Sequence, residues 1–271
     1  MVPWLFQQEA NTVDSVNKTL YIPLYGKSYI SKRGIILHDP KAEEIWAAEG
    51  FPLRGKSASK WLSFYMGMRA VVFDRWLEQR MEEMPEATVL HLGCGMDSRI
   101  CRVGEQGHRW YDIDFPDVIA QRKRYYPENE NYKMLAADVT ADAFLSEVAG
   151  KSAIVVMEGI SMYLKPEQLQ RLMLRLCSHF EQVSLLMDCY TEFAAKASKY
   201  RNPINDVGVT EVYGLDEPKL LENHGLSFLQ EPDMTPPDLI DQLQGMEKAV
   251  FKKLYAGSVA RKMYRLYEYR K

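Results

Sequence analysis

The sequence predicts an α/β fold, with a parallel sheet that is covered by helices on both faces. Short apolar runs such as 87–92 and 152–157 are typical of strands buried inside a sheet. Segments with helical periodicity separate these runs, and a glycine, Gly93, follows the first of them directly. Strands that alternate with helices in this way build a parallel sheet between two helical layers.

The first 85 residues are expected to be mainly helical. Glu43 to Glu49 is a short amphipathic stretch that follows Asp39-Pro40, and proline is favoured in the first turn of a helix. From Ser59 to Met84, apolar residues recur at steps of three and four, which predicts one long helix. Pro85 ends this helix, because the residue before a proline avoids helical backbone angles.

The middle of the chain alternates between strands and helices. Five strands are predicted, at residues 87–92, 108–113, 132–135, 152–157 and 183–187. One helix is expected over about 116–125, and a second begins at Pro166. The apolar residues of the second helix share one face and are Leu169, Leu172, Met173 and Leu176.

The last third is less regular. Residues 190–216 are polar and are interrupted by Pro203 and Gly208. Two late strands are expected at 226–229 and 265–269, with a helical stretch over 238–255 between them. We therefore expect a single domain over 1–271, which consists of an N-terminal helical lid (1–85), a ligand-binding core (86–189) and an insertion with the final strands (190–271).

The composition is that of a soluble globular protein. Of the 271 residues, 46% are hydrophobic, 26% are charged and 11% are aromatic, which excludes disorder as the main state. The 34 basic and 37 acidic side chains give a net charge of −3. This near-balance argues against a protein whose main task is to coat nucleic acid or an anionic membrane.

Neither a membrane segment nor a metal site is expected from the sequence. No apolar stretch approaches the roughly 18 residues that span a bilayer, and the start MVPWLFQQEANTVD lacks the features of a signal peptide. The four cysteines have no C-x-x-C spacing and are expected to be reduced, so a cytoplasmic location is predicted. The five histidines are scattered and show no metal-ligand spacing.

The sharpest motif is V-L-H-L-G-C-G-M-D-S-R, from Val89 to Arg99. A strand leads into Gly93-Cys94-Gly95, and Ser98 then starts a helix. Glycines at such a turn allow the backbone to approach a ligand closely. The two glycines alone are also compatible with an ordinary tight turn between a strand and a helix.

Three carboxylates follow the ends of three successive strands after this turn, namely Asp114, Asp138 and Glu158. Ligands of open α/β sheets bind at this edge. Asp114 lies about 20 positions after the glycines, where a carboxylate accepts hydrogen bonds from ribose hydroxyls, and Asp138 is placed to meet an adenine amino group. Each acid taken singly also suits the N-terminus of a following helix.

The third glycine of a dinucleotide-binding motif is absent, since Ser98 stands in its place. This favours a nucleoside ligand without phosphates over NAD. S-adenosylmethionine fits this description, because it combines adenine, ribose and an amino-acid tail with a positive sulfonium.

The motifs resemble the leucine carboxyl methyltransferase superfamily, and most closely its bacterial branch of polyketide-type (tetracenomycin-type) O-methyltransferases. The resemblance extends over nearly the whole chain and rests on L-G-C-G-M-D-S-R, W-Y-D-I-D-F-P-D-V-I, A-D-V, M-E-G-I-S-M-Y-L, Y-I-P-L-Y-G-K-S-Y-I, L-H-D-P-K-A-E-E-I and Y-G-L-D-E-P-K-L-L-E. It implies a class I S-adenosylmethionine-dependent methyltransferase fold, which is Rossmann-like with a mostly parallel seven-stranded sheet.

The resemblance also implies roles in cofactor binding for eight residues. They are Gly93 and Gly95 at the methionine portion, Asp114 at the ribose, Asp138 and Val139 at the adenine, Glu158 at the amino group, and Arg69 and Lys27 at the carboxylate. Arg69 also fits a solvated helix charge, and Lys27 is the weaker match of the two. The late insertion differs from that of the eukaryotic relatives, so the substrate does not carry over.

A small-molecule carboxylate is the expected methyl acceptor. A carboxylate is ionised at pH 7 and needs no general base, whereas a phenol with a pKa of about 10 benefits from one, and the sequence marks no such base. Tyr163 is expected either to border the acceptor pocket or to be a packing aromatic.

Other interpretations remain open at this stage: a phenolic O-methyltransferase, a regulatory subunit that binds the cofactor without catalysis, a nucleotide-dependent oxidoreductase, and a nucleic-acid methyltransferase. The sequence does not predict the identity of the acceptor or the oligomeric state.

Overall fold

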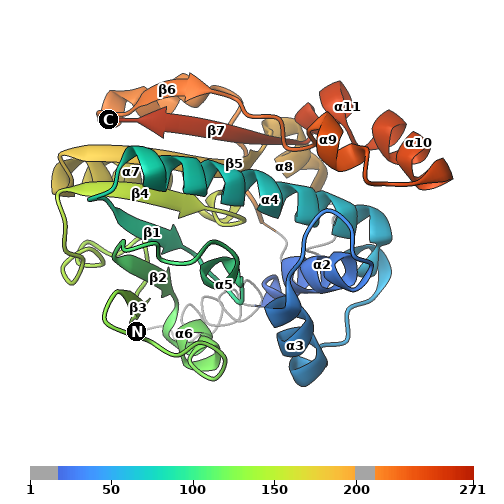
Figure 1. Ribbon diagram of the computed structural model, residues 1–271. Coiled ribbons are helices and arrows are strands. Elements are labelled where there is room, and N and C mark those ends of the chain that lie inside the picture. Colours follow the sequence, from blue (N-terminus) through green and yellow to red (C-terminus); the bar gives the residue numbers. More distant parts are fainter. Residues whose placement is uncertain (1–17, 199–210) are drawn as a thin grey trace, which may run out of the picture.

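The computed structural model describes residues 18–198 and 211–271 (Figure 1). Residues 1–17, which hold the start that lacks signal-peptide features, lie outside this part, as do Pro203 and Gly208. Within it, the chain folds around one sheet of seven strands, with helices on both faces. No helix in the described ranges has the length and apolar character needed to cross a membrane.

The sheet has the strand order β3-β2-β1-β4-β5-β7-β6. Its strands are β1 (Thr88–Leu92), β2 (Trp110–Asp114), β3 (Tyr132–Ala136), β4 (Ser152–Met157), β5 (Gln182–Tyr190), β6 (Ser227–Gln230) and β7 (Tyr264–Arg270). The first five strands are parallel, and β7 is antiparallel to both of its neighbours, β5 and β6. The predicted α/β class and the mostly parallel seven-stranded sheet are confirmed.

The described helices occur before, between and after the strands. They are α2 (Tyr21–Lys32), α3 (Pro40–Glu49), α4 (Lys60–Glu83), α5 (Arg99–Val103), α6 (Pro116–Arg122), α7 (Pro166–His179), α8 (Glu192–Ser198), α9 (Pro237–Ile240), α10 (Gly245–Leu254) and α11 (Gly257–Arg261), with short 3-10 helices at Gly55–Ala58, Ser161–Tyr163 (η2) and Pro218–His224. As expected, Asp39-Pro40 begins a helix, because the Asp39 carboxylate accepts a hydrogen bond from the N–H of Ala42 at 2.9 Å.

Several predicted boundaries were wrong. Strand β2 begins at Trp110 and not at 108, because the His108 ring hydrogen-bonds to the Ala87 carbonyl at 2.8 Å and holds the preceding turn. Helix α6 ends at Arg122, short of the predicted 125. The helical stretch expected over 238–255 is split into α9 and α10, where Gly245 adopts a φ of +51°. The polar stretch after Tyr190 contains helix α8.

Alternate residues of the strands pack into two cores, one on each face of the sheet. Val89, Ile154 and Leu186 face helix α4 in the first core. Leu90, Val155 and Leu185 face helix α7 in the second core. Strands that are buried on both faces explain why the sequence shows them as continuous apolar runs.

Helices α2 and α4 lie in close contact through glycines. A Cβ atom on Gly67 would lie 2.5 Å from Ile30 Cδ1, and one on Gly26 would lie 3.0 Å from the Met66 Cβ. A larger residue at position 26 would therefore press on Met66 Cβ and on the backbone at Ser63, and one at position 67 would displace the end of the Ile30 side chain. Helix α2 of the N-terminal segment thus packs tightly against α4, the long helix that borders the sheet.

Candidate functional site

A cavity of about 1260 Å³ opens at the edge of the sheet where the parallel strands end. It is lined by residues that follow β1, β2, β3 and β4, and by α2, α4, α8 and the segment from α10 to β7. All nine residues named from the sequence line this cavity: Lys27, Arg69, Gly93, Gly95, Asp114, Asp138, Val139, Glu158 and Tyr163. The fold thus brings together residues that are up to 136 positions apart in the chain, from Lys27 to Tyr163.

The glycine turn after β1 requires glycine at both positions. Gly93 and Gly95 have φ angles of +65° and +50°, which side-chain-bearing residues rarely adopt. A Cβ atom on Gly93 would also lie 2.6 Å from the Cδ1 atom of Ile160. The bare backbone of this turn forms one wall of the cavity.

Asp114 at the tip of β2 holds the turn in place. Its carboxylate accepts hydrogen bonds from the N–H groups of Gly95 at 2.7 Å and of Phe115 at 2.8 Å. Burial raises the pKa of Asp114, and these two N–H donors offset part of that rise. Each carboxylate oxygen has a second lone pair, so the group can accept further hydrogen bonds from a ligand in the cavity.

Asp138 and Val139 follow β3 at the outer part of the same edge. The Asp138 carboxylate accepts hydrogen bonds from the N–H of Thr140 at 2.7 Å and from its hydroxyl at 2.8 Å, both on Oδ1. Asp138 is exposed, whereas Val139 is buried with 6% of its surface accessible. An apolar contact thus lies beside a hydrogen-bond acceptor, as a purine ring with an amino group requires.

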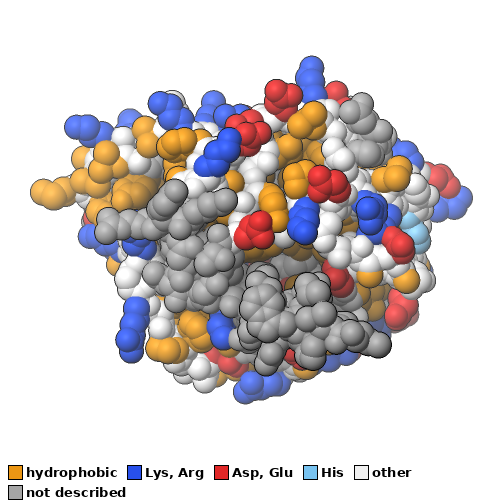
Figure 2. All heavy atoms as spheres, turned by 180° about the vertical axis from the view of Figure 1, so that it is seen from behind, with side chains coloured by type: hydrophobic (Ala, Val, Ile, Leu, Met, Phe, Trp, Pro, Cys, Tyr) orange, Lys and Arg blue, Asp and Glu red, His pale blue; other side chains and the backbone are white. Residues whose placement is uncertain are grey.

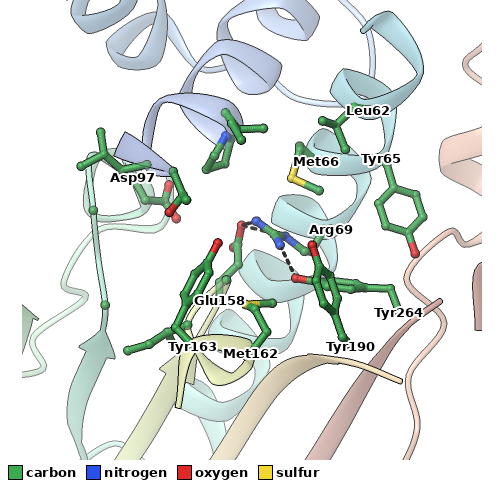
Figure 3. Close-up of a pocket in the computed structure, with 18 of the residues that line it drawn as sticks. Leu62, Tyr65, Met66, Arg69, Asp97, Glu158, Met162, Tyr163, Tyr190 and Tyr264 are labelled. Carbon is green, nitrogen blue, oxygen red and sulfur yellow. Dashed lines mark hydrogen bonds and ion pairs between the residues drawn. The ribbon is translucent and has the colours of Figure 1, made fainter. Parts of the chain in front are cut away.

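Arg69 joins helix α4 to the tips of two strands (Figure 3). Its guanidinium pairs with Glu158 at 3.0 Å and with Asp188 at 2.8 Å, and it donates a hydrogen bond to the Tyr264 hydroxyl at 2.7 Å. With 3% of its surface accessible, Arg69 is not the solvated helix charge that the sequence left open.

Glu158 lies between two guanidinium groups, those of Arg69 and Arg99. Burial pushes the pKa of Glu158 upward, but the two positive charges outweigh burial and bring the pKa to about 2. The carboxylate is therefore ionised throughout the physiological pH range.

Lys27 is buried and forms an ion pair with Asp97 at 2.9 Å. Asp97 also pairs with Arg99 at 3.1 Å and with Arg102 at 3.0 Å. Burial raises the pKa of Asp97, but these cations outweigh it and hold the pKa well below its ordinary value. We call Lys27, Arg69, Asp97, Arg99, Glu158 and Asp188 the charged end of the cavity, although Arg99 and Asp188 lie just behind its surface.

Sequence reasoning missed three members of the charged end. Asp97 and Arg99 stand in the G-C-G-M-D-S-R motif itself, but no role was assigned to them. Asp188 directly follows the fifth predicted strand, 183–187, and the rule that singled out acids at strand tips would have found it. Burial raises the pKa of Asp188, and Arg69 and the Tyr264 hydroxyl counteract that rise.

Another part of the cavity is mostly apolar and rich in tyrosine. Figure 3 shows Tyr65, Tyr163, Tyr190 and Tyr264 around the space beside Arg69. The other members of this wall are apolar and come from α4, η2, α8, α10, α11 and the segment between α11 and β7: Leu62, Met66, Met162, Ala194, Leu254, Val259, Ala260 and Met263. We call this part the tyrosine end of the cavity. Tyr163 thus borders the cavity, and its hydroxyl also hydrogen-bonds to Thr19.

A metal ion has no evident place in the described residues. In residues 18–198 and 211–271, no three His, Cys, Asp or Glu side chains come together as a ligand set.

Comparisons with known proteins agree with this geometry. Residues 15–177 match the family model for leucine carboxyl methyltransferases. The tetracenomycin polyketide synthesis O-methyltransferase TcmP of Streptomyces glaucescens is 29% identical over 248 residues, which cover 89% of this chain and 92% of TcmP. The S-adenosyl-L-methionine-dependent methyltransferase dpfgK of Gibberella zeae is 29% identical over 191 residues, 64% of each chain.

Solved structures share the fold at low sequence identity. A candidate methyltransferase from Thermobifida fusca YX superposes with a TM-score of 0.57 at 13% identity, over 91% of this chain and 94% of that one. Magnesium protoporphyrin IX methyltransferase from Synechocystis PCC 6803 superposes with a TM-score of 0.50 at 11% identity, over 90% and 97% of the two chains. With the family match, these likenesses confirm the class I methyltransferase fold. The chain belongs to the leucine carboxyl methyltransferase family and is an S-adenosylmethionine-dependent O-methyltransferase.

Proposed function

We propose that this enzyme forms a methyl ester on the carboxylate of a small, polyketide-like molecule. The observation that carries the proposal is the division of one cavity into a charged end and a tyrosine end. The charged end suits the cofactor, and the tyrosine end suits an apolar acceptor that carries an anionic group.

The charged end fits the amino-acid tail of S-adenosylmethionine. This tail has an ammonium and a carboxylate group, and the cavity offers the ionised Glu158 beside the cations Arg69 and Lys27. The Asp97 carboxylate is held by Lys27, Arg99 and Arg102, so it fixes the position of Lys27 beside the cavity. We assign Glu158 to the ammonium group and Arg69 with Lys27 to the carboxylate.

The strand tips provide the rest of the cofactor site in this proposal. Gly93 and Gly95 line the cavity with bare backbone, which the methionine chain of the cofactor can approach closely. The carboxylate of Asp114 accepts hydrogen bonds from the ribose, and Asp138 with Val139 contacts the adenine. When bound, the cofactor supplies an activated methyl group on a positive sulfonium.

The tyrosine end provides hydrogen-bond donors. Burial raises the pKa values of Tyr65, Tyr163 and Tyr264 above that of a free phenol, so these hydroxyls stay protonated at neutral pH. The Tyr264 hydroxyl already donates to Asp188 and that of Tyr163 is bonded to Thr19, so a protonated Tyr65 is the donor left for an acceptor that is already ionised, which a carboxylate is and a phenol is not. The contribution of the enzyme is then to align and desolvate the reacting groups.

The charge distribution favours a small acceptor over nucleic acid. Lysines and arginines are mixed with aspartates and glutamates over the face in Figure 2, and the net charge of the whole chain is −3. A phosphate backbone is bound by a continuous basic surface, and its binding weakens steeply with salt. We expect methyl transfer by this enzyme to change little with salt.

Transfer of a labelled methyl group to a panel of small acids and phenols tests the proposal. The label should appear in a product that mild alkali hydrolyses to methanol. A product that is stable to alkali would show that the enzyme forms an ether or an N-methyl group and not an ester. Transfer to purified RNA that is lost at moderate salt would contradict a small acceptor, and cofactor binding without transfer to any acceptor would indicate a regulatory subunit.

We also propose that the enzyme works in the cytoplasm. All four cysteines are free thiols, and Cys94, Cys177 and Cys189 are buried. Proteins of oxidising compartments generally form disulfides, whereas proteins of the cytosol keep their thiols reduced. Fractionation of cells that express the tagged protein tests this location, and recovery outside the cytosol would contradict it.

A further inference from the structure

One stripe of helix α4 runs along the cavity, from the tyrosine end to the charged end. Leu62, Tyr65, Met66 and Arg69 all line the cavity and follow the spacing of a single helix face. Tyr65 lies four residues before Arg69, which is about 6 Å along the helix axis. A group bound at Tyr65 therefore lies about one helical turn beyond the side chain that pairs with Glu158.

The Tyr65 hydroxyl differs from those of its neighbours, because in the described part of the chain it has no hydrogen-bond partner. The Tyr264 hydroxyl donates to Asp188 at 2.7 Å and accepts from Arg69, and that of Tyr163 is bonded to Thr19. The Tyr65 side chain is half-buried and faces the cavity. A phenol in this position is free to bind a ligand.

The ring of Tyr65 belongs to an aromatic wall. It meets the Tyr264 ring edge-on, with the ring centres 6.1 Å apart, and Tyr264 meets Tyr190 edge-on at 5.0 Å. Rings in this arrangement expose apolar surface that favours a flat or aromatic ligand body. The exposed apolar residues Leu254 and Met263 continue this surface outward.

From this geometry we propose a subsite for the methyl acceptor, in which the Tyr65 hydroxyl donates a hydrogen bond to the acceptor carboxylate and the rings of Tyr264 and Tyr190 hold a planar apolar body. The proposal rests on the proposed function and names its substrate class as aromatic or polycyclic carboxylic acids. The carboxylate oxygen that is not bonded to Tyr65 attacks the methyl carbon. The bond from that carbon to sulfur breaks, its electron pair stays on sulfur, and no proton is released.

The variant Tyr65→Phe tests this subsite, because it removes one hydroxyl and keeps the ring. The probes are 2-naphthoate and anthracene-2-carboxylate, with decanoate as the non-aromatic acid. We expect the KM for the aromatic acids to rise roughly 10- to 100-fold, the range for a lost hydrogen bond to a charged group. The kcat and the Kd of S-adenosylmethionine should stay within about twofold, which separates acceptor binding from structural damage.

Tyr25→Phe is the matched control. Tyr25 is a half-buried tyrosine of the neighbouring helix α2 that does not line the cavity, so this variant should match the wild-type enzyme in every constant.

Three outcomes overturn the subsite: an unchanged KM in Tyr65→Phe, a loss of cofactor affinity equal to the loss of acceptor affinity, or a preference of the wild-type enzyme for decanoate. Failure of the proposed function is different, since the wild-type enzyme would then methylate none of the three acids.

Discussion

The two ends of the cavity are built on opposite physical principles. At the charged end, Lys27, Arg69 and Arg99 are each at most 3% exposed, and every one of them pairs with a buried carboxylate. At the tyrosine end, Leu254 and Met263 are 54% and 43% exposed, and most of the wall is apolar. Buried ion pairs require fixed partners, whereas an apolar wall tolerates changes of shape. The difference indicates that the charged end, which we propose for the cofactor, is the less adaptable part of the cavity, and that the tyrosine end, which we propose for the acceptor, tolerates more change.

Glu158→Ala tests how rigidly the charged end depends on its ion pairs, and we expect the largest effect here. The substitution leaves the buried guanidiniums of Arg69 and Arg99 without one shared partner. Removal of one partner from a buried pair typically costs about 3–5 kcal/mol of stability. Urea unfolding should show this loss, and calorimetry should show no S-adenosylmethionine binding.

The control for this variant is Glu181→Ala, which removes an exposed carboxylate that lies near Lys151. It should change neither stability nor binding. If Glu158→Ala binds the cofactor with normal affinity, Glu158 does not take part in cofactor binding. The charged end would then depend less on fixed ion pairs than we propose.

The dependence of stability on pH tests how much the ionised Glu158 of the charged end contributes to the stability of the fold. The pKa of Glu158 is about 2 in the folded protein, against 4.5 for an unperturbed glutamate. Its contribution to stability is therefore fully present above about pH 4.5 and is lost as the pH falls towards 2, with a total of about 3 kcal/mol. In Glu158→Gln this part of the acid dependence should disappear. Unfolding curves between pH 2 and 6 measure it, and parallel losses in both proteins would contradict the assignment.

Asp114→Ala is expected to have an intermediate effect. The carboxylate holds the N–H of Gly95, so the variant loses a ribose acceptor together with the support of the glycine turn. The Kd of S-adenosylmethionine should rise roughly 10- to 100-fold. Asp117→Ala, at an exposed site in the first turn of α6, is the control and should bind normally. An unchanged Kd in Asp114→Ala would exclude Asp114 from ribose binding.

Met263→Ala, at the tyrosine end, is expected to have the smallest effect. Met263 lines the cavity but is 43% exposed, so the free energy of unfolding should change by less than about 0.5 kcal/mol. The KM for an aromatic acid should rise a few-fold, and the Kd of the cofactor should stay constant. Met246→Ala, at an 81% exposed residue outside the cavity, is the control. A large change in cofactor affinity would show that the two ends are coupled.

The sequence predicted the sheet and the strand-end residues that line the cavity better than it predicted the tyrosine end. The five parallel strands are apolar runs, and Asp114, Asp138 and Glu158 stand directly at or after strand ends, where local reasoning applies. At the tyrosine end, Tyr65 contacts Tyr264, which lies far away in the sequence, and no local sequence pattern predicts such a contact.

Local sequence patterns also could not predict which charged side chains pair with one another at the charged end. Arg69 lines the cavity, but its contacts with Asp188 and Tyr264 depend on residues that lie 119 and 195 positions away. The start of strand β2 was missed because a single side chain, His108, decides it.

The glycine contact between α2 and α4 has a mechanical consequence. Because positions 26 and 67 carry no side chain, α2 and α4 approach closely, with Met66 packed against Gly26 and Ile30 packed against Gly67. The pair should therefore move as one stiff body, and its amide protons should exchange with solvent at similarly slow rates. Lys27 belongs to α2 and Arg69 to α4, so we expect the distance between these two side chains to change little as the protein fluctuates. A larger residue at position 67 should loosen this body and make the exchange rates of the two helices diverge.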